Sequence, residues 1–168
     1  MHNLYNQTTI KNLCKQHRLT PSKKYGQNYL VNPKPINKMI EAANLSQKDL
    51  IVEIGPGFGV LTFELTKLVK KVFAFEIEKK LEKYWQENKQ KNLEIIWGNF
   101  LNKSDSLPKT PYKVVANLPY QITSAVIRKF LEANNKPDSI TLMVQKEVAE
   151  RICAKPGKMS KLAVSVQY

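Results

Sequence analysis

From residue 50 onward, short apolar runs alternate with amphipathic stretches, and this alternation limits the possible folds more than any other feature of the sequence. Continuous apolar runs are typical of strands that are buried on both faces of a parallel sheet. Parallel strands need long connections, and helices in right-handed crossovers cover both faces. The sequence therefore predicts an α/β fold with a doubly wound parallel sheet. The predicted strands are residues 50–54, 72–75, 93–97, 114–116 and 140–144, and the predicted helices are residues 60–68, 78–89, 122–132 and 146–153.

Three segments outside this regular pattern also have helical character. Apolar residues at helical spacing predict a helix over residues 9–19, with Thr8 or Thr9 as its N-cap. A second helix is expected over residues 33–43, because prolines are favoured in the first helical turn. The pattern of residues 162–166 fits a helix or a strand equally well.

The charge of the chain is strongly positive and unevenly distributed. The 168 residues contain 27 Lys and Arg against 14 Asp and Glu, a net charge of +13. Residues 1–40 contain no acidic residue, and we expect residues 1–24 to form a basic N-terminal extension to one domain of residues 25–168. Such a chain attracts polyanions, nucleic acid first and an anionic membrane second. A lysine-rich surface typical of an AT-rich genome is the alternative explanation.

Several classes of protein are disfavoured by the same sequence. No apolar run approaches the roughly 20 residues of a membrane-spanning helix. The first residues lack the basic and apolar regions of a secretory signal. Cys14 and Cys153 lack the spacing of metal ligands, so we expect no metal site and two thiols in a reducing cytoplasm.

The loops after the predicted strands carry the candidate chemistry, because parallel α/β sheets bind ligands beyond the carboxyl ends of their strands. The first such loop contains Gly55, Gly57 and Gly59, a spacing that matches neither the dinucleotide motif nor a P-loop. Glu76 follows Gly55 by 21 residues and ends the second strand. A carboxylate at that place can accept hydrogen bonds from both hydroxyls of a ribose. The combination indicates a ribose-containing cofactor, whereas a structural turn and a solvated acid are the alternatives.

The loops after the third and fourth strands extend this pattern. Asn99 and Phe100 follow the third strand, where side chains can reach the adenine end of a nucleotide. The fourth strand leads into the tetrapeptide of residues 117–120, Asn-Leu-Pro-Tyr. Taken alone this tetrapeptide is a turn, but behind a glycine loop and a ribose-binding acid it is the most specific motif in the chain.

Five motifs in this order resemble the S-adenosylmethionine-dependent ribosomal RNA adenine N6,N6-dimethyltransferases. They are residues 24–30, 53–59, 75–78, 117–120 and 145–151. The chain is most similar to the small-subunit branch, which also acts in ribosome assembly in the cytoplasm. The resemblance implies a Rossmann-like methyltransferase core with strand order 3-2-1-4-5. It also implies that the last two strands and the C-terminal helical domain of the family lie outside these 168 residues.

The resemblance also implies a set of cofactor contacts for S-adenosyl-L-methionine. Asn28 and Leu30 would lie near its methionine part, and Glu76 would bind the ribose. Ile77 and Phe100 would sandwich the adenine, and Asn99 would contact its amino group. The whole implied cofactor-binding set is Asn28, Leu30, Glu53, Gly55, Gly57, Glu76, Ile77, Asn99, Phe100 and Asn117.

The implied catalytic residues are those of the tetrapeptide. The Asn117 side-chain oxygen and the Leu118 carbonyl would accept the two N–H bonds of the target adenine amine. Pro119 would keep the turn rigid. Tyr120 would stack on the extruded base.

Some features leave other functions open. The family usually has Asp where this chain has Asn99, so we expect weaker cofactor binding. A non-catalytic RNA-binding or ribosome-assembly factor, a large-subunit methyltransferase of the resistance branch and a DNA adenine methyltransferase are the alternatives. The expected partner is the pre-ribosomal small subunit and its rRNA, and the expected state is a monomer that could associate through the edge of the fifth strand.

Overall fold

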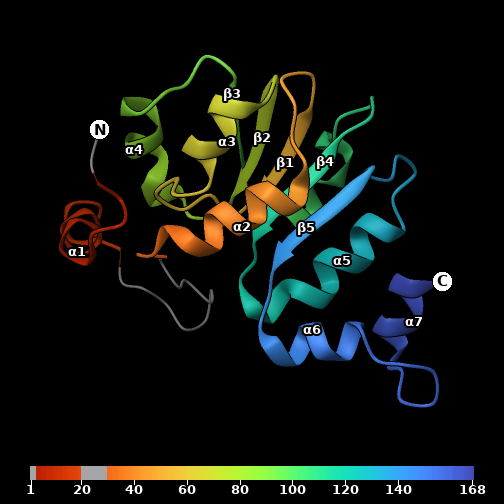
Figure 1. Ribbon diagram of the computed structural model, residues 1–168. Helices are drawn as coiled ribbons and strands as arrows, with labels where there is room; N and C mark the ends of the chain where they lie inside the picture. The colour runs from red at the N-terminus through yellow and green to blue at the C-terminus, as the bar shows by residue number, and fades with distance from the viewer. Residues whose placement is uncertain (1–2, 20–29) are drawn as a thin grey trace.

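A computed structural model describes residues 3–19 and 30–168 of the chain. Its centre is a five-stranded parallel sheet with the order β3-β2-β1-β4-β5, which confirms the predicted fold class and strand order (Figure 1). The strands are β1 (Leu50–Ile54), β2 (Lys71–Glu76), β3 (Leu93–Trp97), β4 (Lys113–Asn117) and β5 (Ser139–Met143). Each lies within two residues of its predicted position, because its apolar run is bounded by polar residues.

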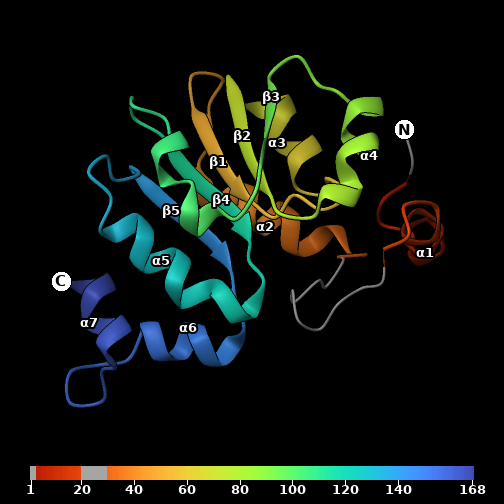
Figure 2. The same ribbon diagram turned by 180° about the vertical axis from the view of Figure 1, so that it is seen from behind.

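Helices connect the strands and cover the sheet. They are α1 (Gln7–Gln16), α2 (Pro33–Ala43), α3 (Thr62–Leu68), α4 (Glu82–Glu87), α5 (Thr123–Leu131), α6 (Lys146–Ile152) and α7 (Lys161–Gln167). Short 3-10 helices are η2 (Lys79–Leu81), η3 (Phe100–Asn102), η4 (Ser104–Ser106) and η5 (Tyr120–Ile122). α2 crosses the sheet face that is turned to the viewer in Figure 1, and it lies behind the strands in Figure 2.

The two faces of the sheet are packed by alternate residues of the same strands. On one face Ile51 and Val72 contact the apolar sides of α2 and α3. On the other face Val52 and Phe75 belong to a cluster that includes Phe130 of α5. This alternation follows from the period of two along a strand, and it explains why the runs of a doubly covered sheet are apolar throughout.

Three helix predictions need correction. Asn6, and not Thr8 or Thr9, is the N-cap of α1, because its side-chain oxygen accepts the backbone N–H groups of both threonines. The helix predicted over residues 60–68 begins only at Thr62, after the glycine loop and its turn. The helix predicted over residues 78–89 is divided into η2 and the short α4. The ambiguous segment near the C-terminus is the helix α7.

α1 is part of the packed structure. Its residues Ile10 and Leu13 are buried in a cluster with Phe58 of the glycine loop and with Tyr84 and Trp85 of α4. The basic residues of α1 therefore lie on a helix whose apolar side is docked. The expected domain boundary at residue 24 falls outside the described residues and stays a prediction.

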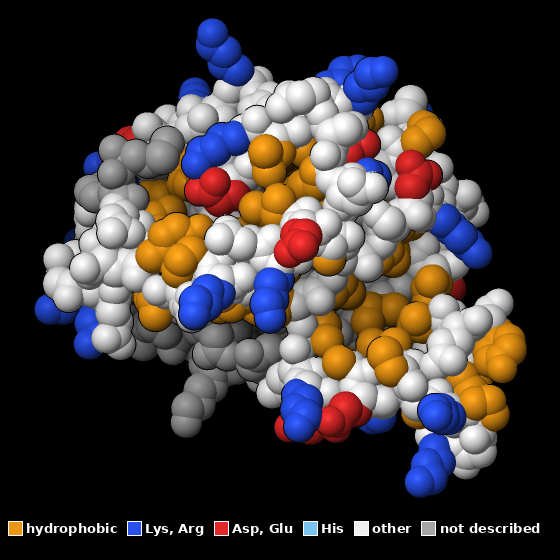
Figure 3. All heavy atoms as spheres, viewed as in Figure 1, with side chains coloured by type: hydrophobic (Ala, Val, Ile, Leu, Met, Phe, Trp, Pro, Cys, Tyr) orange, Lys and Arg blue, Asp and Glu red, His pale blue; other side chains and the backbone are white. Residues whose placement is uncertain are grey.

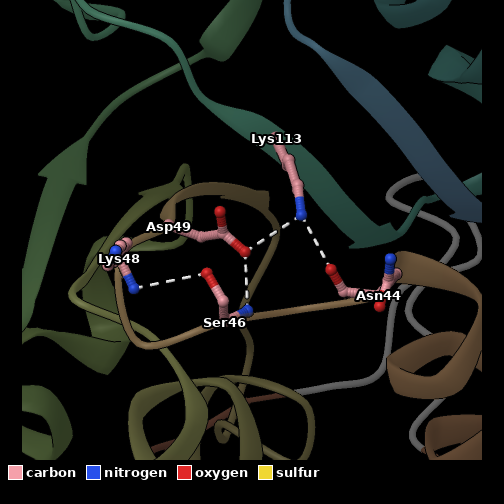
Figure 4. A network of polar contacts seen from close by, with 5 residues as sticks. All are labelled: Asn44, Ser46, Lys48, Asp49 and Lys113. Carbon is pink, nitrogen blue, oxygen red and sulfur yellow. Dashed lines mark hydrogen bonds and ion pairs between the residues drawn. The ribbon is translucent and has the colours of Figure 1, made fainter.

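A polar network closes the end of the sheet where the strands begin (Figure 4). Lys113, the first residue of β4, donates to the Asn44 carbonyl at 2.7 Å and to the Asp49 carboxylate at 3.0 Å. The same carboxylate accepts the backbone N–H of Ser46 at 2.7 Å. The network therefore joins the end of α2, the entry to β1 and the entry to β4.

β5 forms one edge of the sheet, and α7 packs against α5 and α6 nearby. Hydrophobic side chains gather over this part of the molecule in Figure 3. Val164, Val166 and Tyr168 are exposed there. The expected association through the β5 edge stays a prediction. In the part of the chain that the structure describes, no helix combines the length and apolarity needed to cross a membrane.

Candidate cofactor and catalytic site

A cavity of about 230 Å³ lies where the strands end. It is lined by Ile54 at the end of β1, by Gly55 directly after it, by Ile77 after β2, by Asn99 after β3 and by Pro119 after β4. Four loops that are far apart in sequence thus meet at one place, as expected for a doubly wound sheet. The cavity unites the predicted residues Gly55, Ile77, Asn99, Phe100 and Pro119.

The glycine loop between β1 and α3 has a backbone conformation that other residues rarely adopt. Gly55, Gly57 and Gly59 have φ values of +71°, +56° and +86°. A side chain at Gly59 would also collide with Phe63 and Trp85, whose atoms would lie 2.6 Å and 2.8 Å from its Cβ. The glycines are therefore required by local geometry, at Gly59 by packing as well.

The Glu76 carboxylate is buried and fixed by backbone donors. One oxygen accepts the N–H of Gly57 at 3.0 Å and the other accepts the N–H of Glu78 at 2.8 Å. Burial raises the pKa of Glu76, although these backbone hydrogen bonds act in the opposite direction. Each carboxylate oxygen can accept more than one hydrogen bond, so this fixed group can still bind hydroxyls.

Glu53 lies deeper than Glu76, near the end of β1. Its side chain is 2% exposed, and its Oε2 has no hydrogen-bond partner among the described residues. The pKa of Glu53 is raised to about 8. Burial is the largest cause, the Thr62 side chain acts in the opposite direction, and the charge of Glu76 adds to the rise. Neither acid lines the cavity itself, but each is next in sequence to residues that do. Buried acids with raised pKa values near a cavity are typical of a functional site.

The residues predicted to contact adenine occupy different environments. Ile77 is 49% exposed and offers a free apolar side chain at the cavity. Phe100 lines the cavity but is 3% exposed, since its ring packs against Phe75 and Phe130 with centroid distances of 5.1 Å and 4.9 Å. The Asn99 side-chain oxygen accepts the Leu101 N–H at 3.0 Å and so caps η3. The adenine sandwich and the amino contact stay predictions.

The tetrapeptide begins at the end of β4. Asn117 is the last residue of the strand and is half-buried, whereas the Leu118 side chain is buried in the core. The Pro119 carbonyl accepts the Ile122 N–H at 3.1 Å, which turns the chain into η5 and then α5. The burial of this side chain leaves the backbone of Leu118 as the part that could meet a ligand, and its role as an acceptor stays a prediction.

Other site predictions remain open, and five residues that line the cavity were missed. Asn28 lies outside the described residues, and Leu30 packs against the α2 side of the core. The lining residues absent from the predicted site are Ile54, Phe75, Gly98, Gln121 and Ile122. Each lies within two residues of a predicted site residue, and this position in the sequence was the available signal. No group of three His, Cys, Asp or Glu that could hold a metal occurs within residues 3–19 and 30–168.

The fold and the cavity together define a class. A glycine loop, a buried acid at the end of β2 and a cavity at the carboxyl ends of a 3-2-1-4-5 sheet are the parts of a Rossmann-like nucleotide-cofactor domain. Within that class the chain belongs to the ribosomal RNA adenine dimethylase family, whose model matches residues 18–168.

Curated relatives support the same assignment. The chain is 42% identical over 168 aligned residues to a ribosomal RNA small subunit methyltransferase A from Dehalococcoides mccartyi, with 94% of this chain covered. It is 37% identical to the protein of the same name from Enterococcus faecalis. It spans 56% and 57% of the length of these two relatives.

Two solved structures are similar in fold and sequence. A dimethyladenosine transferase from Plasmodium falciparum is 33% identical with a TM-score of 0.68, over 80% of this chain and 50% of that one. The 23S rRNA methyltransferase ErmE is 33% identical with a TM-score of 0.71, over 82% of this chain and 56% of that one. Of these two names, only that of ErmE gives an RNA substrate, 23S rRNA.

Proposed function

We propose that this chain is the cofactor-binding and catalytic part of an S-adenosyl-L-methionine-dependent methyltransferase that dimethylates N6 of adjacent adenosines in small-subunit rRNA. One observation supports the proposal above all. The glycine loop, Glu76 at the end of β2 and the tetrapeptide that begins at Asn117 all lie at the carboxyl ends of the parallel strands. The reaction belongs to ribosome assembly in the cytoplasm.

The residues present fit this cofactor. Glu76 is held in place to accept the ribose hydroxyls, and Ile77 offers an apolar surface to the adenine. Glu53 keeps an oxygen without a hydrogen-bond partner among the described residues, beneath the glycine loop. At Gly55 an added Cβ would meet only Pro119, at 3.9 Å, so the backbone there is open to a ligand. When bound, S-adenosylmethionine supplies a methyl group on a sulfonium centre.

The tetrapeptide can make the adenine amine reactive. The amine nitrogen is a weak nucleophile because its lone pair is delocalised into the ring. The Asn117 side-chain oxygen and the Leu118 carbonyl would accept its two N–H bonds and favour a pyramidal nitrogen. Pro119 holds this turn through its fixed φ, which is −57°. Catalysis then consists mainly of positioning and electrostatics.

The proposal of small-subunit rather than large-subunit rRNA as the substrate is supported by the names of the related proteins. The curated relatives named above are ribosomal RNA small subunit methyltransferases, whereas one of the two structural relatives is named as a 23S rRNA methyltransferase. Sequence similarity therefore favours the small subunit over the large one. The net charge of +13 suits a polyanionic partner, and we expect the chain to act as a monomer.

Methyl transfer to ribosomal particles tests the proposal. The chain and labelled S-adenosylmethionine are incubated with small subunits that lack the adenosine methyl groups, and with large subunits as a control. Dimethyladenosine measured by mass spectrometry in the small-subunit rRNA alone is the expected result. Cofactor binding without methyl transfer would favour a non-catalytic assembly factor, and labelled large subunits would favour the resistance branch.

A further inference from the structure

We propose that Tyr84 is a positioning residue for the glycine loop, and that its hydroxyl holds this loop in the shape that accepts the cofactor. The inference rests on the proposed function of the loop. Tyr84 belongs to α4, which follows β2 and does not line the cavity at the strand ends. Its side chain is 3% exposed, and its hydroxyl donates to the Phe58 carbonyl at 2.8 Å.

The loop needs such support because of its own composition. Gly57 and Gly59 flank Phe58 and both have left-handed φ values. Glycine adopts many backbone conformations with similar ease, so these residues do little to select one of them. The shape of the loop must therefore come from the hydrogen bonds that its peptide groups make with the surrounding structure.

Three hydrogen bonds around Phe58 bear on the shape of the loop. The Gly57 N–H donates to Glu76, and the Gly59 N–H donates to the Pro56 carbonyl at 2.8 Å. Because a peptide group is planar, the Tyr84 hydroxyl fixes the Phe58 carbonyl and the Gly59 N–H together. Glu76 thus fixes the loop at the Gly57 N–H, and Tyr84 fixes it at the Phe58 carbonyl. Glu76 is also the expected ribose ligand, so the two supports flank the ligand-binding backbone.

The surroundings of Tyr84 favour a strong hydrogen bond. The Phe58 and Tyr84 rings pack edge to face with a centroid distance of 5.1 Å. The ring of His17, at the end of α1, packs against the Tyr84 ring with a centroid distance of 5.6 Å. α1 therefore covers this contact from outside and excludes water, which strengthens a hydrogen bond and makes an unpaired carbonyl costly. Burial also raises the pKa of Tyr84, so the hydroxyl remains a donor.

Tyr112 provides a matched control. It is 1% exposed, and its hydroxyl donates to the Asn135 carbonyl at 3.0 Å, in the same kind of bond as that of Tyr84. Tyr112 directly precedes β4 and so lies at the opposite end of the sheet from the cavity. The substitutions Tyr84→Phe and Tyr112→Phe each remove one buried hydroxyl and leave the ring in place.

The experiment compares these two variants with the wild-type chain. We measure the affinity for S-adenosylmethionine, the melting temperature, and hydrogen exchange of the loop peptide without cofactor. Both variants should lose similar thermal stability. Only Tyr84→Phe should raise the cofactor dissociation constant, about fivefold to thirtyfold, and speed exchange in residues 56–59. Equal affinities of both variants for the cofactor would overturn the proposal.

The exchange measurement separates this inference from the proposed function. If the wild-type chain did not bind S-adenosylmethionine, the proposed function would fail, but exchange in the cofactor-free loop would still be measurable. Faster exchange in Tyr84→Phe alone would then support the role of Tyr84 in holding the loop. Unchanged exchange in residues 56–59 would contradict that role.

Discussion

Asp49 and Glu53 lie at opposite ends of β1, and their surroundings differ in kind. Asp49 accepts hydrogen bonds from Lys113 at 3.0 Å and from the Ser46 backbone at 2.7 Å (Figure 4). Burial alone would raise its pKa, but these partners lower it below the usual value. Glu53 is more deeply buried and keeps an oxygen without a partner among the described residues, and burial raises its pKa to about 8.

The contrast between Asp49 and Glu53 indicates that one end of the sheet contributes mainly to stability and the other mainly to ligand binding. At the amino ends of the strands, each group of the network has an opposite charge or a donor, so the network stabilises the fold. At the carboxyl ends, the Glu53 oxygen without a partner among the described residues costs stability, and such a group is typical of a functional site. Substitutions at the two ends should therefore have separable effects.

The largest effect is expected at the tetrapeptide. Asn117→Ala should reduce methyl transfer a hundredfold or more, the order found when one stabilising donor or acceptor is removed from a reacting centre. Cofactor affinity should stay within a few-fold, because the interaction forms mostly in the transition state. Single-turnover assays with small subunits measure this effect, and wild-type turnover by the variant would exclude the proposed role.

The next effect concerns the ribose. Glu76→Ala should weaken cofactor binding by about 1.5–3 kcal/mol, the range for lost charge-assisted hydrogen bonds. Equilibrium dialysis with labelled cofactor measures the change. Glu94→Ala removes an acid from the neighbouring strand β3 and should leave the affinity unchanged. Equal affinities of wild type and Glu76→Ala would place the ribose elsewhere.

A third effect should depend on pH. Between pH 4.5, the ordinary pKa of a glutamate, and about pH 8, Glu53 is protonated in the folded protein but ionised in the unfolded chain. Its contribution to stability therefore falls as pH rises through this window. Glu53→Gln mimics the protonated acid and should flatten this fall in urea unfolding between pH 5 and pH 8. As a control, Glu87→Gln at an exposed position should leave the fall in stability with pH unchanged. If Glu53→Gln lost stability with pH as steeply as the wild-type chain, the raised pKa of Glu53 would be contradicted.

The smallest effect is expected at the amino ends. Lys113→Met should lower the free energy of unfolding by about 1 kcal/mol, since the Lys113–Asp49 pair is only partly buried and still partly screened. Cofactor affinity should not change. The more exposed pair of Lys71 and Glu94 gives a control, because Lys71→Met should cost less. Loss of cofactor binding in Lys113→Met would show that the two ends are not independent.

The stability conferred by the hydrogen bonds between Lys113 and Asp49 should also depend on pH in the acidic range. A lowered pKa in the folded state means that Asp49 stabilises the protein above its ordinary pKa, 3.8, and loses this contribution as pH falls further. The difference in stability between wild type and Lys113→Met should therefore shrink below pH 4. A constant difference down to pH 2 would contradict the lowered pKa.

The fold could be predicted because its signals are local. The apolar runs of residues 50–54 and 93–97 define β1 and β3 with the same bounds as the structure. Helix ends were less predictable, since the choice of Asn6 over Thr8 as N-cap depends on which side chain reaches the free N–H groups. The division of residues 78–89 likewise depends on packing.

The site was predicted in part. Glu76 and the glycine loop are directly joined by a hydrogen bond, which the spacing suggested only as proximity. Tyr84 was not predicted, because a tyrosine in an amphipathic helix gives no sign that its hydroxyl meets a carbonyl 26 residues away. The Lys113–Asp49 pair was not predicted either, since charged residues are common along the whole chain.

Calorimetric titration of S-adenosylmethionine into the wild-type chain, Glu76→Ala and Lys113→Met tests the central claim most directly. We expect saturable binding to one site in the wild-type chain, and an equal affinity in Lys113→Met despite its lower stability. In Glu76→Ala the affinity should be at least tenfold weaker, about 1.4 kcal/mol or more. No binding by the wild-type chain, or equal binding by all three proteins, would contradict the assignment of the carboxyl-end cavity as the cofactor site.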